Sequence, residues 1–229
     1  VRFQPWLRIL NHMKTSSGMQ LQQSPDVIQL QQPQFLDAGS VAAKAFENDP
    51  VLTYLISDNR EFRKQSLTWL MCKLIAYSTR YNHVYTTQKL EGISAWIPPE
   101  TNFSNPFQLL KMVWSLQLYT LPTKIRWTRL GRCLKLLWAV EHAQQQDMDN
   151  CPHWYLGIMM VDPTAQGRGI GSHLLQPILQ QASHEGIACY LVTFTKQAVR
   201  FYQKHGFEIV QSQKISLHAP PFWTMKRNP

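Results

Sequence analysis

Apolar residues recur along the chain with two different periods, and this difference predicts the order of strands and helices. Alternating positions or short apolar runs bounded by turn residues predict strands at 26–32, 83–87, 93–97, 155–161, 188–193, 207–217 and 221–226. Apolar residues that return every three or four positions predict helices at 35–48, 62–81 and 172–185, with a short one beginning near 198. A longer helical stretch at about 106–146, interrupted at Leu121-Pro122, is predicted to be an insertion.

The order of these elements sets the predicted fold class. The strands at 83–87 and 93–97 form a hairpin, whereas the strand at 155–161 reaches the strand at 188–193 through a helix, which predicts one parallel pair. We therefore expect an α/β fold with a mostly antiparallel central sheet and helices on both faces. The length of 229 residues fits a single domain, which we place at 25–229 after an N-terminal extension at 1–24.

A glycine-rich loop separates the strand at 155–161 from the helix that follows it. The loop comprises Gln166, Gly167, Arg168, Gly169, Ile170 and Gly171, and Ser172 begins the helix. Backbone N–H groups in such a loop, together with the positive end of the helix dipole, form a cradle for a phosphate. Glycine lets the phosphate approach the backbone, and Arg168 can add a forked charged contact.

The spacing of the glycines separates this loop from two related phosphate-binding motifs. No lysine follows the loop, as a Walker motif requires. Glycines at 167, 169 and 171 also miss the Gly-x-Gly-x-x-Gly spacing of dinucleotide-binding folds. The loop matches Gln/Arg-x-x-Gly-x-Gly/Ala, and 36 positions after Gln166 a second motif, Tyr-x-x-x-Gly-Phe, begins at Tyr202.

These two motifs, in this order, resemble those of the GNAT acetyltransferases, which are acetyl-CoA-dependent N-acetyltransferases. The resemblance is clearest over residues 150–210 and extends more weakly from about residue 26 to the C-terminus. His153-Trp154-Tyr155-Leu156 and the closing Trp223-Thr224-Met225 also resemble a GNAT branch that includes antibiotic-inactivating enzymes such as the puromycin N-acetyltransferase.

The resemblance implies where acetyl-CoA binds. The two parallel strands splay apart, and pantetheine lies between them against the backbone of Met159, Met160 and Val161. The pyrophosphate is held by the glycine-rich loop and Ser172. A backbone N–H on the strand stabilises the oxyanion, and Tyr202 donates a proton to the departing thiolate. The same tyrosine could instead be a core aromatic residue beside Phe201 and Phe207.

The proton acceptor for the amine stays open. Where some GNAT enzymes carry a glutamate on the strand, this chain has Tyr155. His153 can accept a proton directly or through water, or can merely cap the strand; Glu91 and Asp49 are further candidates, and so is solvent. Thr195 stands where many GNAT enzymes place an asparagine, which retains a hydroxyl for the cofactor but removes a two-pronged amide contact.

Composition narrows the environment and the partners. The net charge of +9 suits a polyanionic ligand such as CoA or a generally basic surface. The densest cluster of basic residues is predicted to form a solvated helix face, opposite an apolar core face of Trp127, Leu130, Leu134 and Leu137. We therefore expect no nucleic-acid partner. That cluster comprises Lys124, Arg126, Arg129, Arg132 and Lys135. Four cysteines without paired spacing predict no metal site and a cytoplasmic protein, and we expect no membrane partner.

Three classes of function fit this sequence. The first is an N-acetyltransferase, monomeric or homodimeric, that acetylates a primary amine of a small molecule; within enzymes, a protein or peptide amine is the alternative. Trp96, Trp114, Tyr119 and Trp127 could line an apolar acceptor site or belong to the core. The second is a non-catalytic acyl-CoA-binding sensor or interaction module, and the third is a basic nucleic-acid binder.

Overall fold

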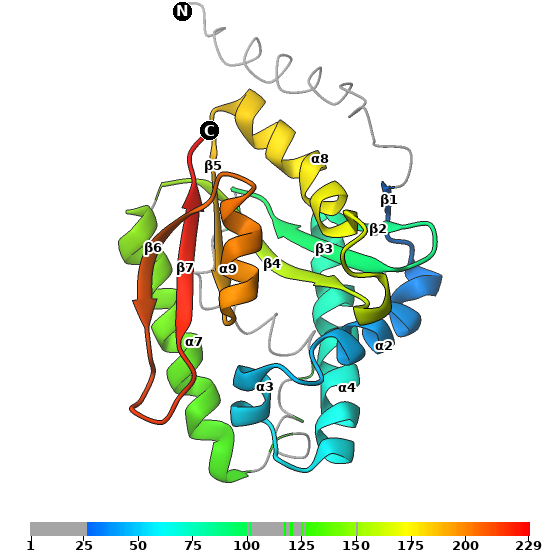
Figure 1. Cartoon of the computed structure of the whole chain (residues 1–229), viewed down its shortest axis with the longest axis vertical. Coiled ribbons are helices and arrows are strands. Elements are labelled where there is room, and N and C mark those ends of the chain that lie inside the picture. Colours follow the sequence, from blue (N-terminus) through cyan, green and yellow to red (C-terminus); the bar gives the residue numbers. More distant parts are fainter. Residues whose placement is uncertain are drawn as a thin grey trace, which may run out of the picture.

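The computed structural model describes residues 27–99, 101, 117, 120, 125, 127–149 and 151–229, which form one mixed sheet of seven strands (Figure 1). The strands are β1 (Val27–Gln29), β2 (Val84–Thr87), β3 (Gly92–Ile97), β4 (His153–Val161), β5 (Ala188–Thr193), β6 (Glu208–Gln213) and β7 (Phe222–Arg227). Their spatial order is β1-β2-β3-β4-β5-β7-β6, and every neighbouring pair is antiparallel except β4 and β5. The predicted fold class, with its one parallel pair, is confirmed.

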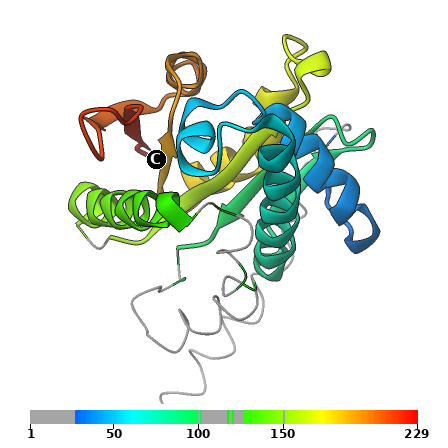
Figure 2. The same cartoon turned by 90° about the horizontal axis from the view of Figure 1, so that it is seen from below.

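Helices cover both faces of this sheet. They are α2 (Phe35–Ala45), α3 (Pro50–Leu55), α4 (Arg60–Ser78), α7 (Trp127–Met148), α8 (Ile170–Glu185) and α9 (Lys196–Gln203), with short 3-10 turns at Gln32–Gln34, Thr79–Tyr81 and Pro163–Ala165. Helix α9 lies on the opposite side of the sheet from α4 and α7 (Figure 2). The predicted N-terminal extension at 1–24 and, within the predicted insertion at about 106–146, residues 106–116, 118–119, 121–124 and 126 lie outside the described residues. No helix in the described part of the chain is long and apolar enough to span a membrane.

Helix α8 is bounded by two glycines in the left-handed region, Gly169 at φ 79° and Gly186 at φ 67°. Between them, Leu174, Leu175 and Ile178 are fully buried in the cluster that joins α8 and α9 to the sheet. Pro177 lacks the N–H that would bond to the His173 carbonyl, and Ser94 of β3 donates its hydroxyl to the adjacent Leu174 carbonyl at 2.8 Å. The helix is therefore fixed to β3 close to its N-terminal end.

Helix α3 is an element that the sequence analysis missed. Asp49 caps it by accepting from the N–H groups of Val51 and Leu52, both at 2.9 Å, and Pro50 occupies the first helical position. Proline at that position, preceded by aspartate, is a typical helix start. The α3 helix matters because it lies against α7 and carries part of the candidate site.

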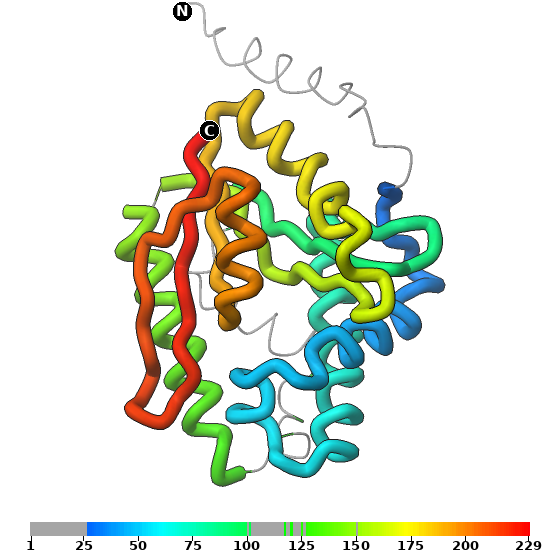
Figure 3. The backbone as a smooth tube through the Cα atoms, in the orientation of Figure 1, coloured from blue at the N-terminus to red at the C-terminus, as the bar shows by residue number. Residues whose placement is uncertain are grey.

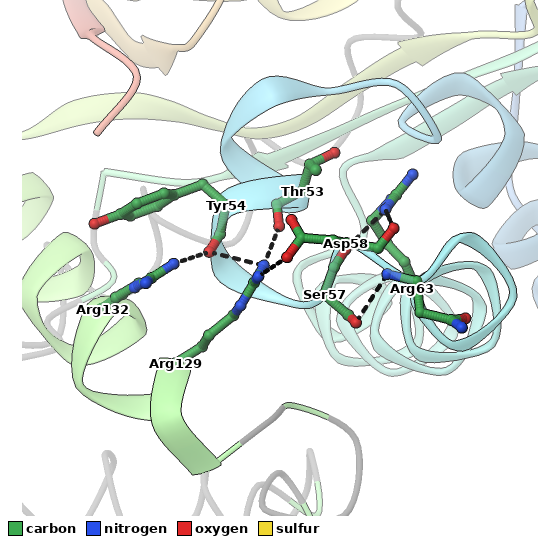
Figure 4. Close-up of polar contacts among 8 residues, drawn as sticks. Thr53, Tyr54, Ser57, Asp58, Arg63, Arg129 and Arg132 are labelled. Carbon is green, nitrogen blue, oxygen red and sulfur yellow. Dashed lines mark hydrogen bonds and ion pairs between the residues drawn. The ribbon is translucent and has the colours of Figure 1, made fainter. Parts of the chain in front are cut away.

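The predicted orientation of α7 is wrong. Arg129, expected on a solvated face, is 9% exposed, whereas Trp127, Leu134 and Leu137, expected in the core, are 71%, 60% and 65% exposed. Figure 4 shows the reason: arginines from α7 and α4 reach the end of α3 and the residues after it. A short helix ends in carbonyl groups without helical partners, and cations satisfy them.

The arginine contacts at α3 are specific. Arg129 donates to the Thr53 carbonyl at 2.7 Å and also binds the Asp58 carboxylate. Arg132 donates to the Tyr54 carbonyl at 3.1 Å. From the other side, the buried Arg63 of α4 donates to the Ser57 carbonyl at 2.7 Å (Figure 4). These cations stabilise backbone geometry, which is a structural role for Arg129 and Arg132 of the basic cluster and for Arg63 of α4.

Candidate active site

Strands β4 and β5 pair along only part of their length. The parallel register runs from His153, opposite Ala188, to Leu156, opposite Leu191. Beyond it, β4 continues to Val161 paired with β3, and β5 continues to Thr193 paired with β7. The backbone trace shows the two strands diverging (Figure 3). Within the described sheet, their facing edges are therefore left unpaired, and an extended ligand can hydrogen-bond to such edges.

A β-bulge at Gly157 marks the point of divergence. Ala95 pairs with Ile158 and Trp96 pairs with Leu156, so Gly157 is an extra residue in β4. A bulge bends its strand and changes which face the following side chains occupy. Consistent with this, Leu156 and Met159 both pack in the α8 cluster, whereas Ile158 packs with the cluster under α2 and α4.

The glycine-rich loop lies where β4 ends and α8 begins. Gly167 and Gly169 have φ values of 78° and 79°, which other residues rarely adopt, and a side chain at Gly167 would meet nothing within 4 Å. The first N–H groups of α8 have no acceptor within the helix, because a helix leaves its first turn unpaired. The geometry fits a phosphate cradle at the open end of the splayed strands.

The loop's side chains take separate positions. Gln166 folds back so that its amide donates to the Val161 carbonyl at 3.3 Å, and Ile170 is buried in the α8 cluster. Ser172 is half-buried in the first turn of α8. A Cβ at Gly171 would lie 3.0 Å from the Phe201 ring and 3.3 Å from Met159 Cε, so α8, α9 and β4 meet closely here.

Arg168, the one cation of the loop, is already paired. Its Nη1 donates to Glu91 Oε1 at 2.8 Å. Glu91 comes from the turn between β2 and β3, and its carbonyl accepts from the Asp162 N–H at 2.7 Å. The carboxylate that we considered as a proton acceptor therefore lies beside the phosphate cradle.

Tyr202 projects from α9 into the α8 cluster and is 7% exposed. Its ring packs edge-on against Phe201 and Phe207, with centroid distances of 5.2 and 5.8 Å. Burial raises the pKa of this phenol well above its usual value, so the hydroxyl stays protonated at neutral pH. Among the described residues, no group hydrogen-bonds to that hydroxyl. Thr195 caps α9 by accepting from the Ala198 N–H at 3.2 Å, so its oxygen is occupied in a structural role.

The segment from Phe46 to Leu55 packs against two hydrophobic clusters, each of which includes a residue of one splayed strand. Phe46 packs with the cluster that contains Ile158 and Met160 of β4. Further along, Tyr54 packs with the cluster that Val192 of β5 joins. Asp49 lies between Phe46 and Tyr54 in the sequence. Its Oδ1 caps α3, its Oδ2 has no hydrogen-bond partner among the described residues, and burial raises the pKa of its carboxyl group.

His153 lies at the other end of β4. It is five residues before Ile158, which corresponds to roughly 17 Å along a strand. Its Nδ1 donates to the Cys151 carbonyl at 2.8 Å, which leaves Nε2 to accept from the Gln144 amide, also at 2.8 Å. Burial lowers the pKa of the imidazole, so the ring is neutral at physiological pH.

No group of three or more His, Cys, Asp or Glu side chains that could hold a metal ion occurs within the described ranges. Cys72, Cys133, Cys151 and Cys189 are all free thiols.

Comparisons with known proteins agree with this geometry. Residues 135–209 match the family model of the acetyltransferase (GNAT) domain, a segment that contains β4, the loop, α8, β5 and Tyr202. An uncharacterized N-acetyltransferase of Schizosaccharomyces pombe is 28% identical over 181 residues, covering 76% of this chain and 71% of that protein. A probable serine/threonine-protein kinase of Dictyostelium discoideum is 35% identical over 68 residues; the match covers 30% of this chain but only 9% of the kinase.

A solved structure extends the match to the fold. The polyamine N-acetyltransferase of Drosophila melanogaster, which catalyses the formation of N-acetylagmatine, superposes with a TM-score of 0.59 over 89% of this chain and 99% of that one. Its sequence identity is 14%, so this likeness gives the fold alone. The matched domain, the shared fold, and the splayed strands beneath a glycine-rich loop together identify residues 135–209 as an acetyltransferase (GNAT) domain within a chain of GNAT fold.

Proposed function

We propose that this chain transfers the acetyl group of acetyl-CoA to a primary amine of a small molecule. The observation that carries the proposal is the divergence of β4 and β5 directly below the glycine-rich loop. A phosphate cradle at one end and two free strand edges at the other suit a long ligand with an anionic head and an amide-containing arm. Acetyl-CoA has both features, and the residues present fit it.

In the proposed reaction, the amine nitrogen attacks the thioester carbon in a ternary complex. A C–N bond forms, the C–S bond breaks, and the electron pair leaves with sulfur. The backbone of Met159, Met160 and Val161 would hold the pantetheine arm, and one N–H there would stabilise the oxyanion. The buried, protonated Tyr202 hydroxyl would donate to the departing thiolate.

We infer that Asp49 is better placed than His153 or Glu91 to receive the proton of the amine. The segment that carries Asp49 packs against clusters that include residues of both splayed strands. Its Oδ2 has no partner among the described residues, and its raised pKa makes it a better base than an ordinary aspartate. His153 lies at the far end of β4, and Glu91 binds Arg168. For His153 to accept the proton instead, the amine would have to reach the N-terminal end of β4.

The choice of a small molecule rests on charge. A lysine-rich protein target favours an acidic channel, and this chain has 14 acidic residues against 23 basic ones. The narrower likeness to the antibiotic-inactivating branch rests on short motifs at 153–156 and 223–225 and stays a prediction.

A second candidate is a non-catalytic acyl-CoA sensor. Thr195 caps a helix where many GNAT enzymes have a cofactor-binding asparagine, and Tyr155 stands where some have a glutamate. These departures favour binding without turnover. The two functions differ in whether an amine causes release of the CoA thiol.

Calorimetric titration with acetyl-CoA tests the cradle. Gly169→Ala places a Cβ in the loop, and Gly186→Ala is its matched control, because both glycines have positive φ at the two ends of the same helix. Each substitution carries about 1–2 kcal/mol of backbone strain. We expect Gly169→Ala to weaken binding by about tenfold or more and Gly186→Ala to leave it unchanged. Equal weakening by both would show that helix strain, rather than contact with the ligand, explains the effect.

A further inference from the structure

The pairing of Arg168 with Glu91 raises a question about how the loop attracts an anion. Arg168 is 59% exposed at its side chain, and Glu91 is 21% exposed. An anion-binding loop gains from a free guanidinium, yet here a carboxylate already occupies it. A partly exposed ion pair of this kind contributes little to folding, so stability does not explain the arrangement.

Glu91 is held in place by the backbone around it. Its N–H donates to Thr87 Oγ1 at 3.0 Å, and its carbonyl accepts from the N–H of Asp162, the residue after β4, at 2.7 Å. Leu90 before it adopts the left-handed conformation at φ 56°. Gly92 after it has no room for a side chain, because a Cβ would lie 2.8 Å from the Met160 carbonyl oxygen. The turn therefore presents its carboxylate to the loop in a fixed position.

We propose that Glu91 is a positioning residue that sets the affinity for acyl-CoA by holding Arg168 and competing with a ligand phosphate for it. This inference rests on the proposed function, because it assumes that the loop binds the CoA phosphates. The carboxylate keeps the guanidinium at the rim of the loop in the free protein. A phosphate that arrives must share or displace that contact, and it also meets the negative charge of Glu91.

The proposal predicts a gain of affinity on mutation, which a purely structural role would not produce. Glu91→Gln keeps the shape of the side chain and an oxygen acceptor but removes the negative charge. We expect it to bind acetyl-CoA about threefold more tightly, with kcat unchanged and KM for acetyl-CoA lowered by the same factor. The gain should shrink in 0.5 M salt, because exposed charges are screened over a few ångström at that ionic strength.

Two further variants test whether Glu91 acts through Arg168. Arg168→Gln should weaken binding by about tenfold. Adding Glu91→Gln to it should recover at most about twofold, because the group that Glu91 holds is then absent. Glu208→Gln, on the exposed edge strand β6, changes the net charge equally without touching the loop and should leave binding unchanged.

The outcomes separate the inference from the function on which it rests. If wild-type protein binds acetyl-CoA but Glu91→Gln binds equally or more weakly, the competition between Glu91 and the ligand is refuted while the proposed function stands. If Glu91→Gln and Glu208→Gln tighten binding equally, the effect is one of overall charge, and the positioning role is refuted. If the wild-type protein does not bind acetyl-CoA, both proposals fail.

Discussion

Replacing Gly92 by alanine should destabilise the domain, because three elements meet at this position. Gly92 begins β3 and pairs with Val161 at the end of β4. An added Cβ would lie 2.8 Å from the Met160 carbonyl oxygen, 2.9 Å from Leu174 Cδ1 and 3.3 Å from Ile170 Cγ2. The carbonyl is backbone in a paired strand, and Leu174 is fully buried, so neither can move away without disturbing β4 or α8.

The size of the effect follows from overpacking. Inserting a methyl group into a filled site costs about 1–3 kcal/mol, and we expect about 2 kcal/mol here. For a domain of this size that corresponds to a fall in Tm of about 4–8 °C. Scanning calorimetry and urea unfolding followed by far-UV circular dichroism measure both quantities.

Gly131→Ala is the matched control. Gly131 lies within α7, and a Cβ there would meet nothing within 4 Å. Alanine should therefore stabilise the protein by about 0.5–1 kcal/mol through its higher helix propensity. A Gly92→Ala protein with unchanged Tm, or a Gly131→Ala protein destabilised to the same extent, would refute this account of packing at the start of β3.

Three other predictions concern the site. Tyr202→Phe should lower kcat by about a hundredfold. The KM for acetyl-CoA and the Tm should stay nearly unchanged, since the hydroxyl has no hydrogen-bond partner among the described residues. A kcat equal to that of the wild type excludes the tyrosine as proton donor. Asp49→Asn retains a good helix cap and removes a buried charge, so stability should stay equal or rise while kcat falls about tenfold or more; unchanged kcat with any amine would remove Asp49 from the reaction. Burial raises the pKa of Tyr155 to about 12 and also raises that of Tyr202, so between pH 10 and 12 the unfolded chain loses phenol protons that the folded chain keeps. The free energy of unfolding should therefore not depend on these two groups below pH 10. Above pH 10 it should fall by up to about 1.4 kcal/mol per pH unit for each tyrosine. A urea midpoint that stays constant from pH 9 to 12 would contradict the burial of these tyrosines.

The sequence predicted the part of the site that is local in the chain. The strand, glycine loop and helix at 155–185 depend on spacing within about thirty residues, and the helix start is a property of the glycines themselves. The second motif likewise contains its own helix and the turn at Gly206, whose φ is 83°. Such features are visible in one sequence because their causes are local.

Features that depend on distant segments were not predictable in this way. Periodicity shows that α7 has a polar and an apolar face, but not that the end of α3, more than seventy residues earlier, draws Arg129 inward. The pairing of Arg168 with Glu91 joins positions 77 residues apart. The packing of α3 with α7 and with Val192 of β5 likewise depends on distant segments, which no local pattern encodes.

Amine-dependent release of the CoA thiol tests the central claim most directly. Purified protein and acetyl-CoA should be incubated with a panel of primary amines that includes polyamines, arylalkylamines and a lysine peptide, with thiol release followed by a chromogenic reagent and products identified by mass spectrometry. The account predicts release that requires a small amine, one acetylated amine for each thiol, and a large loss of rate in Tyr202→Phe. Tight acetyl-CoA binding without thiol release above background for any amine would contradict it and favour the non-catalytic sensor.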